Sequence, residues 1–132
     1  MGLADGRYVE DILKRLSRNF YRQLVFAGII DDTAKLLHFQ KGEAGFPLTI
    51  SRQNAIDVQV SFLSSLAKQF QDFAGKLDFV IMSFSKNDII VIEVLPKMFL
   101  YVICTKGSAP DMADMLTKLV EESPYLEDEW SG

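Results

Sequence analysis

The chain has 132 residues, of which 48% are hydrophobic and 24% are charged. This length fits one domain, which can bury roughly two-thirds of its unfolded surface without disulfides or metals. The composition excludes a disordered chain, and no stretch approaches the roughly 18 consecutive apolar residues that a membrane-spanning helix requires. The single cysteine, Cys104, excludes a disulfide framework and a paired-thiol metal site. Because the sequence also shows no signal-like segment, we expect a cytoplasmic protein.

The net charge of −4 comes from the end of the sequence. Five acidic residues and no basic ones lie among the last twelve, which are Glu121, Glu122, Glu127, Asp128 and Glu129. Without these five, 14 basic and 13 acidic residues remain, so the rest of the chain is close to neutral. We therefore expect one domain over residues 1–122, followed by an acidic tail at residues 123–132.

The first part of the chain predicts a helix and then a β-hairpin. Apolar residues recur at helical spacing from Tyr8 to Phe20, and Asp5 is expected to be the N-cap of this helix. Residues 24–30 and 35–40 have strand length and a β-type composition, and Asp31 begins the Asp-Asp-Thr-Ala segment between them. Because Asp and Thr side chains form local turn hydrogen bonds, this segment predicts a hairpin turn.

A glycine- and proline-containing loop then leads to a second helix, with Ser51 as its expected N-cap and Gly75 as its stop. Three strands follow at residues 77–84, 89–94 and 98–105. The second and third of these strands are apolar at both odd and even positions, which point to opposite faces of a sheet. Both faces of the sheet must therefore be covered. A last helix begins at Ser108, whose spacing to Asp111 predicts a capping box.

The predicted order is α-β-β-α-β-β-β-α. Short connections make the sequential strand pairs antiparallel, and the helices must cover both faces of the sheet. The expected fold is therefore a three-layer α/β (α+β) sandwich with a five-stranded antiparallel sheet between helices.

The second helix has more apolar surface than one sheet face can cover. At 100° per residue, one apolar stripe faces the sheet and consists of Ile56, Val60, Leu63, Ala67, Phe70 and Ala74. A second stripe lies beside it and contains Val58, Phe62, Leu66 and Phe73. Together they span an arc of about 200°, wider than packing on a sheet requires. Either the loop that carries Phe46 covers the second stripe, or a second subunit does, as is usual for large apolar patches.

The strand at residues 77–85 is the most polar of the three, with Ser83 and Ser85 on one phase, and has the pattern of an edge strand. An open edge invites pairing with a symmetric partner, whereas capping by Lys86 and water is the alternative. The candidate dimer interface consists of Val58, Phe62, Leu66, Phe73, Phe79, Val80, Ile81, Met82 and Ser83.

The first helix has a basic stripe, which is a candidate electrostatic contact for an anionic partner. It consists of Arg7, Lys14, Arg15, Arg18 and Arg22, and Asp11 alone interrupts it. The alternative is a solvated face that the acidic tail neutralises. Because the aromatic residues of this helix lie on its apolar side, we expect no nucleic acid partner.

The remaining polar residues predict no chemistry. Glu93 and His38 lie in apolar strands and would make an acid–base pair only in contact, which nothing in the sequence indicates. Cys104 is expected to be an inert core residue, Asn87-Asp88 a turn, and Gly28 a bulge or a close approach to the backbone. We therefore expect no catalytic, metal or cofactor site.

The element order, the Phe-Ala-Gly-Ile-Ile-Asp hairpin start at residues 26–31 and the final strand-turn-strand-turn-strand-helix run resemble the roadblock/dynein light chain family. The family usually has a glycine in the hairpin turn, whereas this chain has Asp31-Asp32-Thr33-Ala34. The resemblance implies a divergent, prokaryotic-type member that dimerises through its central helix and third strand.

It also implies a non-catalytic scaffold or regulator that binds a small Ras-like GTPase or assembles a complex, as a homodimer or a heterodimer. The alternative is a profilin-like or PAS-like monomer that binds a small ligand or a single protein partner.

Overall fold

The computed structural model describes residues 3–45 and 49–122. In chain order the elements are α1 (Leu3–Phe20), β1 (Leu24–Asp31), β2 (Leu36–Lys41), α2 (Ile50–Lys68), α3 (Gln71–Ala74), β3 (Val80–Ser83), β4 (Asn87–Leu95), β5 (Met98–Thr105) and α4 (Ala109–Glu121). The predicted acidic tail lies outside the described residues.

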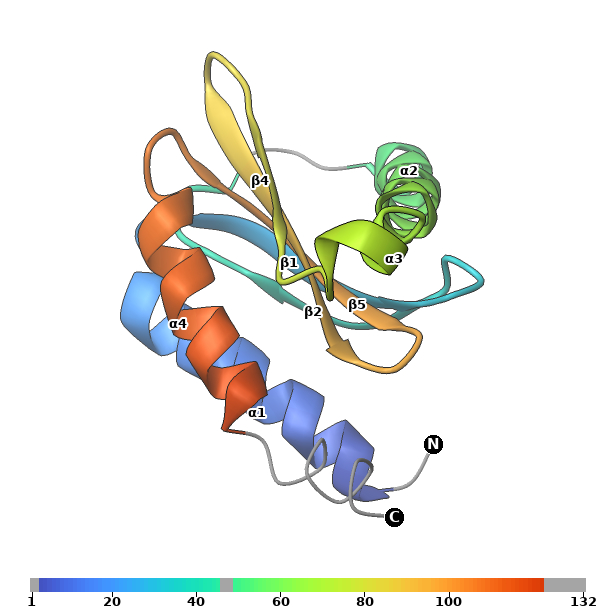
Figure 1. The fold of residues 1–132 in the computed structure, drawn as a ribbon. Coiled ribbons are helices and arrows are strands. Elements are labelled where there is room, and N and C mark those ends of the chain that lie inside the picture. The colour runs from blue at the N-terminus through green and yellow to red at the C-terminus, as the bar shows by residue number, and fades with distance from the viewer. Residues whose placement is uncertain (1–2, 46–48, 123–132) are drawn as a thin grey trace.

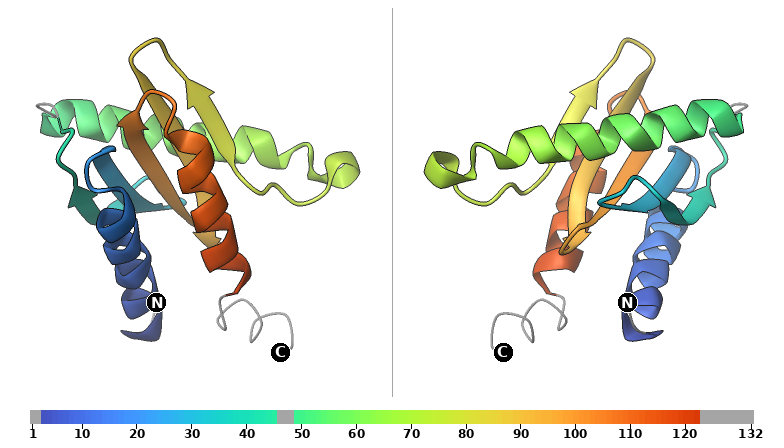
Figure 2. Two further views of the ribbon diagram at one scale, coloured as in Figure 1. Left: turned by 90° about the vertical axis from the view of Figure 1, so that its left-hand side faces the viewer. Right: turned by 90° about the vertical axis from the view of Figure 1, so that its right-hand side faces the viewer.

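The strands form one antiparallel sheet in the order β2-β1-β5-β4-β3. α1 and α4 cover one face, whereas α2 crosses the other face, as Figures 1 and 2 show from three sides. The predicted five-stranded antiparallel sheet between helices is confirmed, with the short helix α3 as an addition. None of the described helices is long and apolar enough to cross a membrane.

The first hairpin is closed by Asp31, as its turn chemistry predicted. Its Oδ1 accepts hydrogen bonds from the Thr33 hydroxyl (2.6 Å), the Thr33 N–H (2.9 Å) and the Lys35 N–H (3.0 Å). These bonds, the Thr33 hydroxyl first among them, hold the pKa of the Asp31 carboxyl below its usual value. Ala34 has a φ of +66°, so a residue with a Cβ occupies the left-handed position where glycine is preferred.

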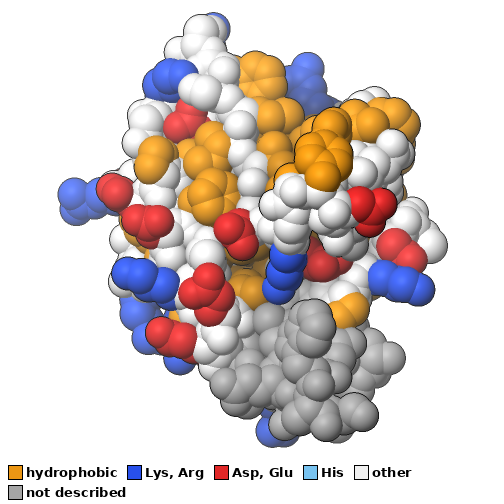
Figure 3. Space-filling model, viewed as in Figure 1, with side chains coloured by type: hydrophobic (Ala, Val, Ile, Leu, Met, Phe, Trp, Pro, Cys, Tyr) orange, Lys and Arg blue, Asp and Glu red, His pale blue; other side chains and the backbone are white. Residues whose placement is uncertain are grey.

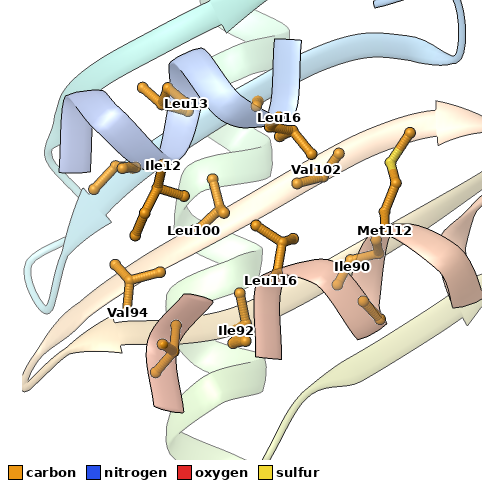
Figure 4. Close-up of a cluster of buried hydrophobic side chains, with 14 of the residues drawn as sticks. Ile12, Leu13, Leu16, Ile90, Ile92, Val94, Leu100, Val102, Met112 and Leu116 are labelled. Carbon is orange, nitrogen blue, oxygen red and sulfur yellow. The ribbon is translucent and has the colours of Figure 1, made fainter. Parts of the chain in front are cut away.

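The sheet has an apolar core on each face. On one face, side chains of α1 and α4 interdigitate with those of β4 and β5 (Figure 4), including Ile12, Leu16, Ile90, Ile92, Leu100, Val102, Met112 and Leu116. On the other face, Val60 of α2 packs among Phe26, Ile30, Val91, Phe99, Tyr101 and Ile103. Cys104 is buried in the first core, and burial raises the pKa of its thiol, as expected for an inert core cysteine.

One buried hydrogen bond, which was not predicted from the sequence, joins α2 to the centre of the sheet. The Tyr101 hydroxyl donates to Asp57 Oδ1 at 2.7 Å, and Gln53 Nε2 donates to Asp57 Oδ2 at 3.3 Å. Asp57 is only 2% exposed. Burial, together with this bond, raises the pKa of Tyr101, so the hydroxyl stays protonated and remains a donor.

Gly28 makes room for the Tyr101 ring. A Cβ at Gly28 would lie 2.8 Å from ring carbons of Tyr101, which faces it across the β1–β5 ladder. The predicted close approach to the Gly28 backbone is therefore confirmed. A larger residue here would displace the Tyr101 ring and with it the hydroxyl that reaches Asp57.

The boundaries of the second helix differ from the prediction. Thr49, not Ser51, is the N-cap of α2, and its hydroxyl accepts a hydrogen bond from the Arg52 N–H at 3.1 Å. The helix ends at Lys68, and Gly75, with a φ of +88°, ends α3 instead. Because α3 is a separate turn, Phe70 and Ala74 are exposed and do not continue the sheet-facing stripe, which is a correction.

Three other local predictions were wrong. Asp5 lies inside α1, which begins at Leu3. Ser108 occupies the N-cap position of α4, but its hydroxyl donates to the Thr105 carbonyl at 2.6 Å and makes no capping bond. Asn87 and Asp88 are not a turn, because β4 begins at Asn87.

We predict that Tyr101→Phe lowers the free energy of unfolding by about 1–3 kcal/mol, because it leaves a buried Asp57 oxygen without its donor. Urea denaturation measures this loss. The matched control, Tyr21→Phe at a half-exposed tyrosine outside this bond, should change stability by less than about 0.5 kcal/mol. An equal loss in both variants would contradict a special role for the buried bond.

Candidate interaction surface

The outward side of α2 and α3 is an exposed apolar surface, which we call the outer face. It consists of Val58, Phe62, Leu66, Phe70 and Phe73. Phe62 is 67% exposed and Phe73 is 79% exposed, values far above those of core residues. The predicted second stripe of the helix is therefore uncovered within the described part of the chain. Phe46, the residue expected to cover it in the alternative interpretation, lies outside that part.

A groove of about 450 Å³ runs along this surface, between α2 and the β3–β4 side of the sheet. Arg52, Ala55, Ile56, Gln59, Val60, Phe62, Leu63 and Leu66 line it from α2, and Met82, Phe84 and Ile89 line it from the sheet side. Figure 3 shows hydrophobic side chains gathered over this part of the molecule. The lining is apolar except for Arg52 and Gln59, so the groove suits an apolar or aromatic occupant.

β3 is an edge strand, as predicted, although it is shorter than expected. It pairs with β4 and ends the strand order, so its other side is open within the described residues. Val80 packs into the α2-side core, whereas Phe79 and Ile81 pack against the α1/α4-side core. The predicted interface residues therefore form the outer face of α2 and α3 together with the neighbouring sheet edge, and they do not lie on one flat surface.

The end of β3 is held by Asp88, which is 3% exposed. Asp88 Oδ1 accepts from the Ser83 hydroxyl at 3.1 Å, and Oδ2 accepts from the Gly107 N–H at 2.9 Å. Lys106 Nζ lies 3.7 Å from Oδ1 and also contacts the Ser83 hydroxyl. The carboxylate thus joins the sheet edge to the chain that enters α4.

The ionisation of Asp88 is set by two opposing effects. Burial opposes the charged form, but the hydrogen bonds from the Gly107 N–H and the Ser83 hydroxyl outweigh it and lower the pKa of this carboxyl. This role was not predicted from the sequence, because Asp88 was expected to lie in a turn.

The basic stripe lies on α1, on the other side of the sheet from the outer face (Figure 2). Its members Arg7, Lys14, Arg15, Arg18 and Arg22 are exposed. Arg15 Nε pairs with Asp11 Oδ2 at 2.9 Å, so the one acidic residue of the stripe neutralises part of it. Arg22 lies two residues beyond the end of α1, so it is not part of the helical stripe, which is a correction.

His38 and Glu93 are not in contact. They lie in β2 and β4, which β1 and β5 separate in the sheet. His38 faces Glu10 of α1, with Nδ1 3.8 Å from Oε1, whereas Glu93 pairs with Phe99, which packs on the α2 side. The acid–base interpretation is therefore excluded. In residues 3–45 and 49–122, no group of three or more His, Cys, Asp or Glu side chains could hold a metal ion.

Comparison with solved structures gives the fold. The structure resembles the roadblock/LC7 domain from Streptomyces avermitilis with a TM-score of 0.67 at 15% sequence identity, covering 88% of this chain and 95% of that one. The chain has the roadblock/LC7 fold. The roadblock resemblance of the sequence is therefore confirmed for the fold.

Two MglB proteins share this roadblock fold. One is MglB from Thermus thermophilus, with a TM-score of 0.64 and 14% identity over 93% of this chain and 95% of that chain. The other is Myxococcus xanthus MglB, with a TM-score of 0.57 and 18% identity over 92% and 93% of the two chains. No protein-family model matches the sequence, and no curated protein matches it significantly.

We predict that Asp88→Asn destabilises this roadblock-like domain and changes its pH dependence. Because the folded-state pKa of Asp88 is lowered, the stability that its charge contributes is present above the unfolded-state pKa and is lost as the pH falls through the folded-state pKa. The native protein should thus lose stability on acidification more steeply than the variant. Urea unfolding between pH 7 and pH 3 measures both slopes, and parallel slopes would contradict the prediction.

Proposed function

We propose that this roadblock-like protein is a non-catalytic, homodimeric scaffold or regulator. In this proposal the outer face of α2 and α3 and the edge of β3 pair with the same surfaces of a second copy. One observation carries the proposal, namely that an uncovered row of large apolar side chains lies beside an open sheet edge. Both features need cover in water, and a twofold partner would cover them together.

The exposed area is large enough for a stable dimer. Phe62, Phe70, Phe73 and Phe84 are exposed by 67, 54, 79 and 52%. At about 200 Å² per phenylalanine, they present about 500 Å² per copy, or about 1,000 Å² for a pair. Stable interfaces bury about 1,200–2,000 Å² in total, so Val58, Leu66 and the backbone of β3 would bring the pair into this range.

Burial of the outer face also supplies part of the free energy of association. Covering three such side chains in each subunit contributes on the order of 5 kcal/mol before the entropic cost of association. Pairing of β3 with its symmetric copy would add backbone hydrogen bonds and continue the sheet across the seam. A fold neighbour supports self-assembly, because a structure with a TM-score of 0.64 to this chain is described as MglB with tetrameric arrangement.

A small Ras-like GTPase is the partner class that the roadblock resemblance implies. In a dimer through the outer face, α1 and α4 would remain on the far side of the sheet and stay accessible. The basic stripe on α1 would then be a candidate contact for an anionic patch of such a partner. We also propose that the protein is cytoplasmic, as its single cysteine led us to expect.

The second candidate function is a monomeric domain that binds a small ligand. The observation that favours it is the apolar groove of about 450 Å³, which falls in the range of small-molecule sites. The two candidates make opposite predictions for the same surface. A ligand-binding monomer should respond in a thermal-shift screen of apolar compounds and should show no self-association.

We predict that Phe62→Glu and Phe73→Glu each convert the dimer into a folded monomer, because each places a charge in an apolar seam. Analytical ultracentrifugation measures the mass, and circular dichroism with thermal melting checks the fold. Tyr21→Glu, at a half-exposed aromatic residue outside the outer face, is the control and should remain dimeric. Variants that unfold would assign the two phenylalanines to the core, and variants that remain dimeric would place the seam elsewhere.

For the partner, we predict that immobilised protein retains a small Ras-like GTPase from the same cells in a nucleotide-dependent manner. The Lys14→Glu/Arg18→Glu double variant should retain less of it, while its dimer mass stays unchanged. Equal retention of the GDP and GTP-analogue forms, or none, would count against a GTPase partner without affecting the dimer.

A further inference from the structure

The outward side of α1 carries positive charges that the described part of the chain does not neutralise. Arg7, Lys14 and Arg18 are exposed. Among the described residues none of the three has an ion pair, whereas Arg15 of the same stripe is paired with Asp11. Lys14 and Arg18 are four positions apart on the helix, so their like charges repel each other. An anionic occupant on this side of α1 would relieve that repulsion.

The end of α4 is acidic and lies at the end of the molecule where the basic stripe begins. α1 and α4 contact each other and run in opposite directions, so α4 ends where α1 begins (Figure 2). Glu121 is the last residue of α4 and Glu122 is its C-cap, and both are exposed. Carboxylates are unfavourable at the C-terminal end of a helix, because the free carbonyl groups there are already negative. Positive charge from α1 is therefore favoured beside them.

The sequence after α4 continues this negative charge. The acidic tail, residues 123–132, has three acidic residues in succession at 127–129 and no basic residue. They lie six to eight residues after the end of α4, which corresponds to a reach of up to about 20–26 Å for an extended chain. The stripe from Arg7 to Arg18 covers eleven residues of helix, or about 16 Å. The three carboxylates are therefore within reach of the stripe on their own subunit.

We propose that the acidic tail docks along the outward side of α1 of its own subunit, where residues 127–129 pair with Lys14 and Arg18. A single exposed ion pair stabilises little, but here several charges on each side act together. Because both segments belong to one chain, their effective concentration is about millimolar, and even a weak contact is populated.

The docked tail covers the basic stripe, so an anionic partner has to displace it before it can bind. The tail is thus an autoinhibitory segment for that surface. This consequence rests on the GTPase contact proposed above, whereas the docking of the tail on α1 requires neither the GTPase nor the dimer.

Tryptophan fluorescence tests the contact in the full chain. Trp130 directly follows the acidic run and is the only tryptophan of the sequence, so its emission reports on the tail without a label. Docking should protect Trp130 from quenching by acrylamide, which is uncharged. We expect protection at about 0.01 M salt, where the Debye length is about 30 Å, and loss of protection at about 1 M salt, where it is about 3 Å.

Charge variants locate the contact. At low salt, Lys14→Glu/Arg18→Glu should raise the quenching constant of Trp130 to the value that the native protein has at high salt. The tail variant Glu127→Gln/Asp128→Asn/Glu129→Gln should do the same, and it alters no residue of the described domain. Combining Lys14→Glu/Arg18→Glu with Glu127→Lys/Glu129→Lys puts opposite charges back on the two segments and should restore the protection.

The matched control is Lys76→Glu/Lys86→Glu, which reverses two exposed charges outside α1 and α4 and should leave Trp130 protected. Loss of protection in the stripe and tail variants, with recovery in the swapped variant, supports the proposal. Equal quenching of the native protein at both salt concentrations, an unchanged stripe variant, or a swapped variant without recovery overturns it. Protection that appears only as the protein concentration rises also overturns it, because the tail would then bind another subunit. The dimer and the GTPase contact are measured separately, by mass and by retention, and none of these outcomes decides them.

Discussion

The hydrogen bond from the Tyr101 hydroxyl to Asp57 fixes how α2 lies on the sheet. A helix covered with apolar residues over a wide arc has no single preferred rotation, because several of its faces pack equally well on a sheet. Asp57 removes this ambiguity, since its carboxylate is buried only where it meets Tyr101 and Gln53. Gly28 is part of the same arrangement because it leaves space for the Tyr101 ring. Rotation of α2 by a quarter turn would separate Asp57 from the Tyr101 hydroxyl.

Once this rotation is fixed, the outer face follows from geometry. Of the described helices, α1 and α4 share one face of the sheet and α2 crosses the other, where Val60 enters the core while Phe62 does not. α3 extends beyond the sheet (Figure 2), and Phe73 is 79% exposed within the described part of the chain. The same position places the groove beside β3, whose end Asp88 holds in place. The exposed apolar row, the groove and the open edge are thus consequences of one buried contact and one short strand, and they lie close enough to act as one surface.

Much of this fold could be predicted from the sequence. Two strands are apolar at both odd and even positions, which required helices on both faces of the sheet. The helical wheel identified Val58, Phe62, Leu66 and Phe73 as apolar residues beyond those that packing on the sheet requires. The helix ends were harder, because Thr49, Ser51 and Gly75 all carry capping signals and tertiary packing decides among them.

The polar contacts between distant parts of the chain could not be predicted. Asp57 and Tyr101 are 44 residues apart, and Asp88 and Gly107 are 19 apart, so only the assembled sheet brings each pair together. The sequence does indicate that Asp57 is unusual, because it is a carboxylate one position from the sheet-facing Ile56 and three from Val60. Nothing in the sequence identifies Tyr101 as its partner.

The central claim is that the outer face is a seam between copies of this chain. Sedimentation equilibrium of the native protein at micromolar concentration tests it most directly: we predict a mass of about twice 14.9 kDa, and a mass of 14.9 kDa that stays constant with rising concentration would contradict it.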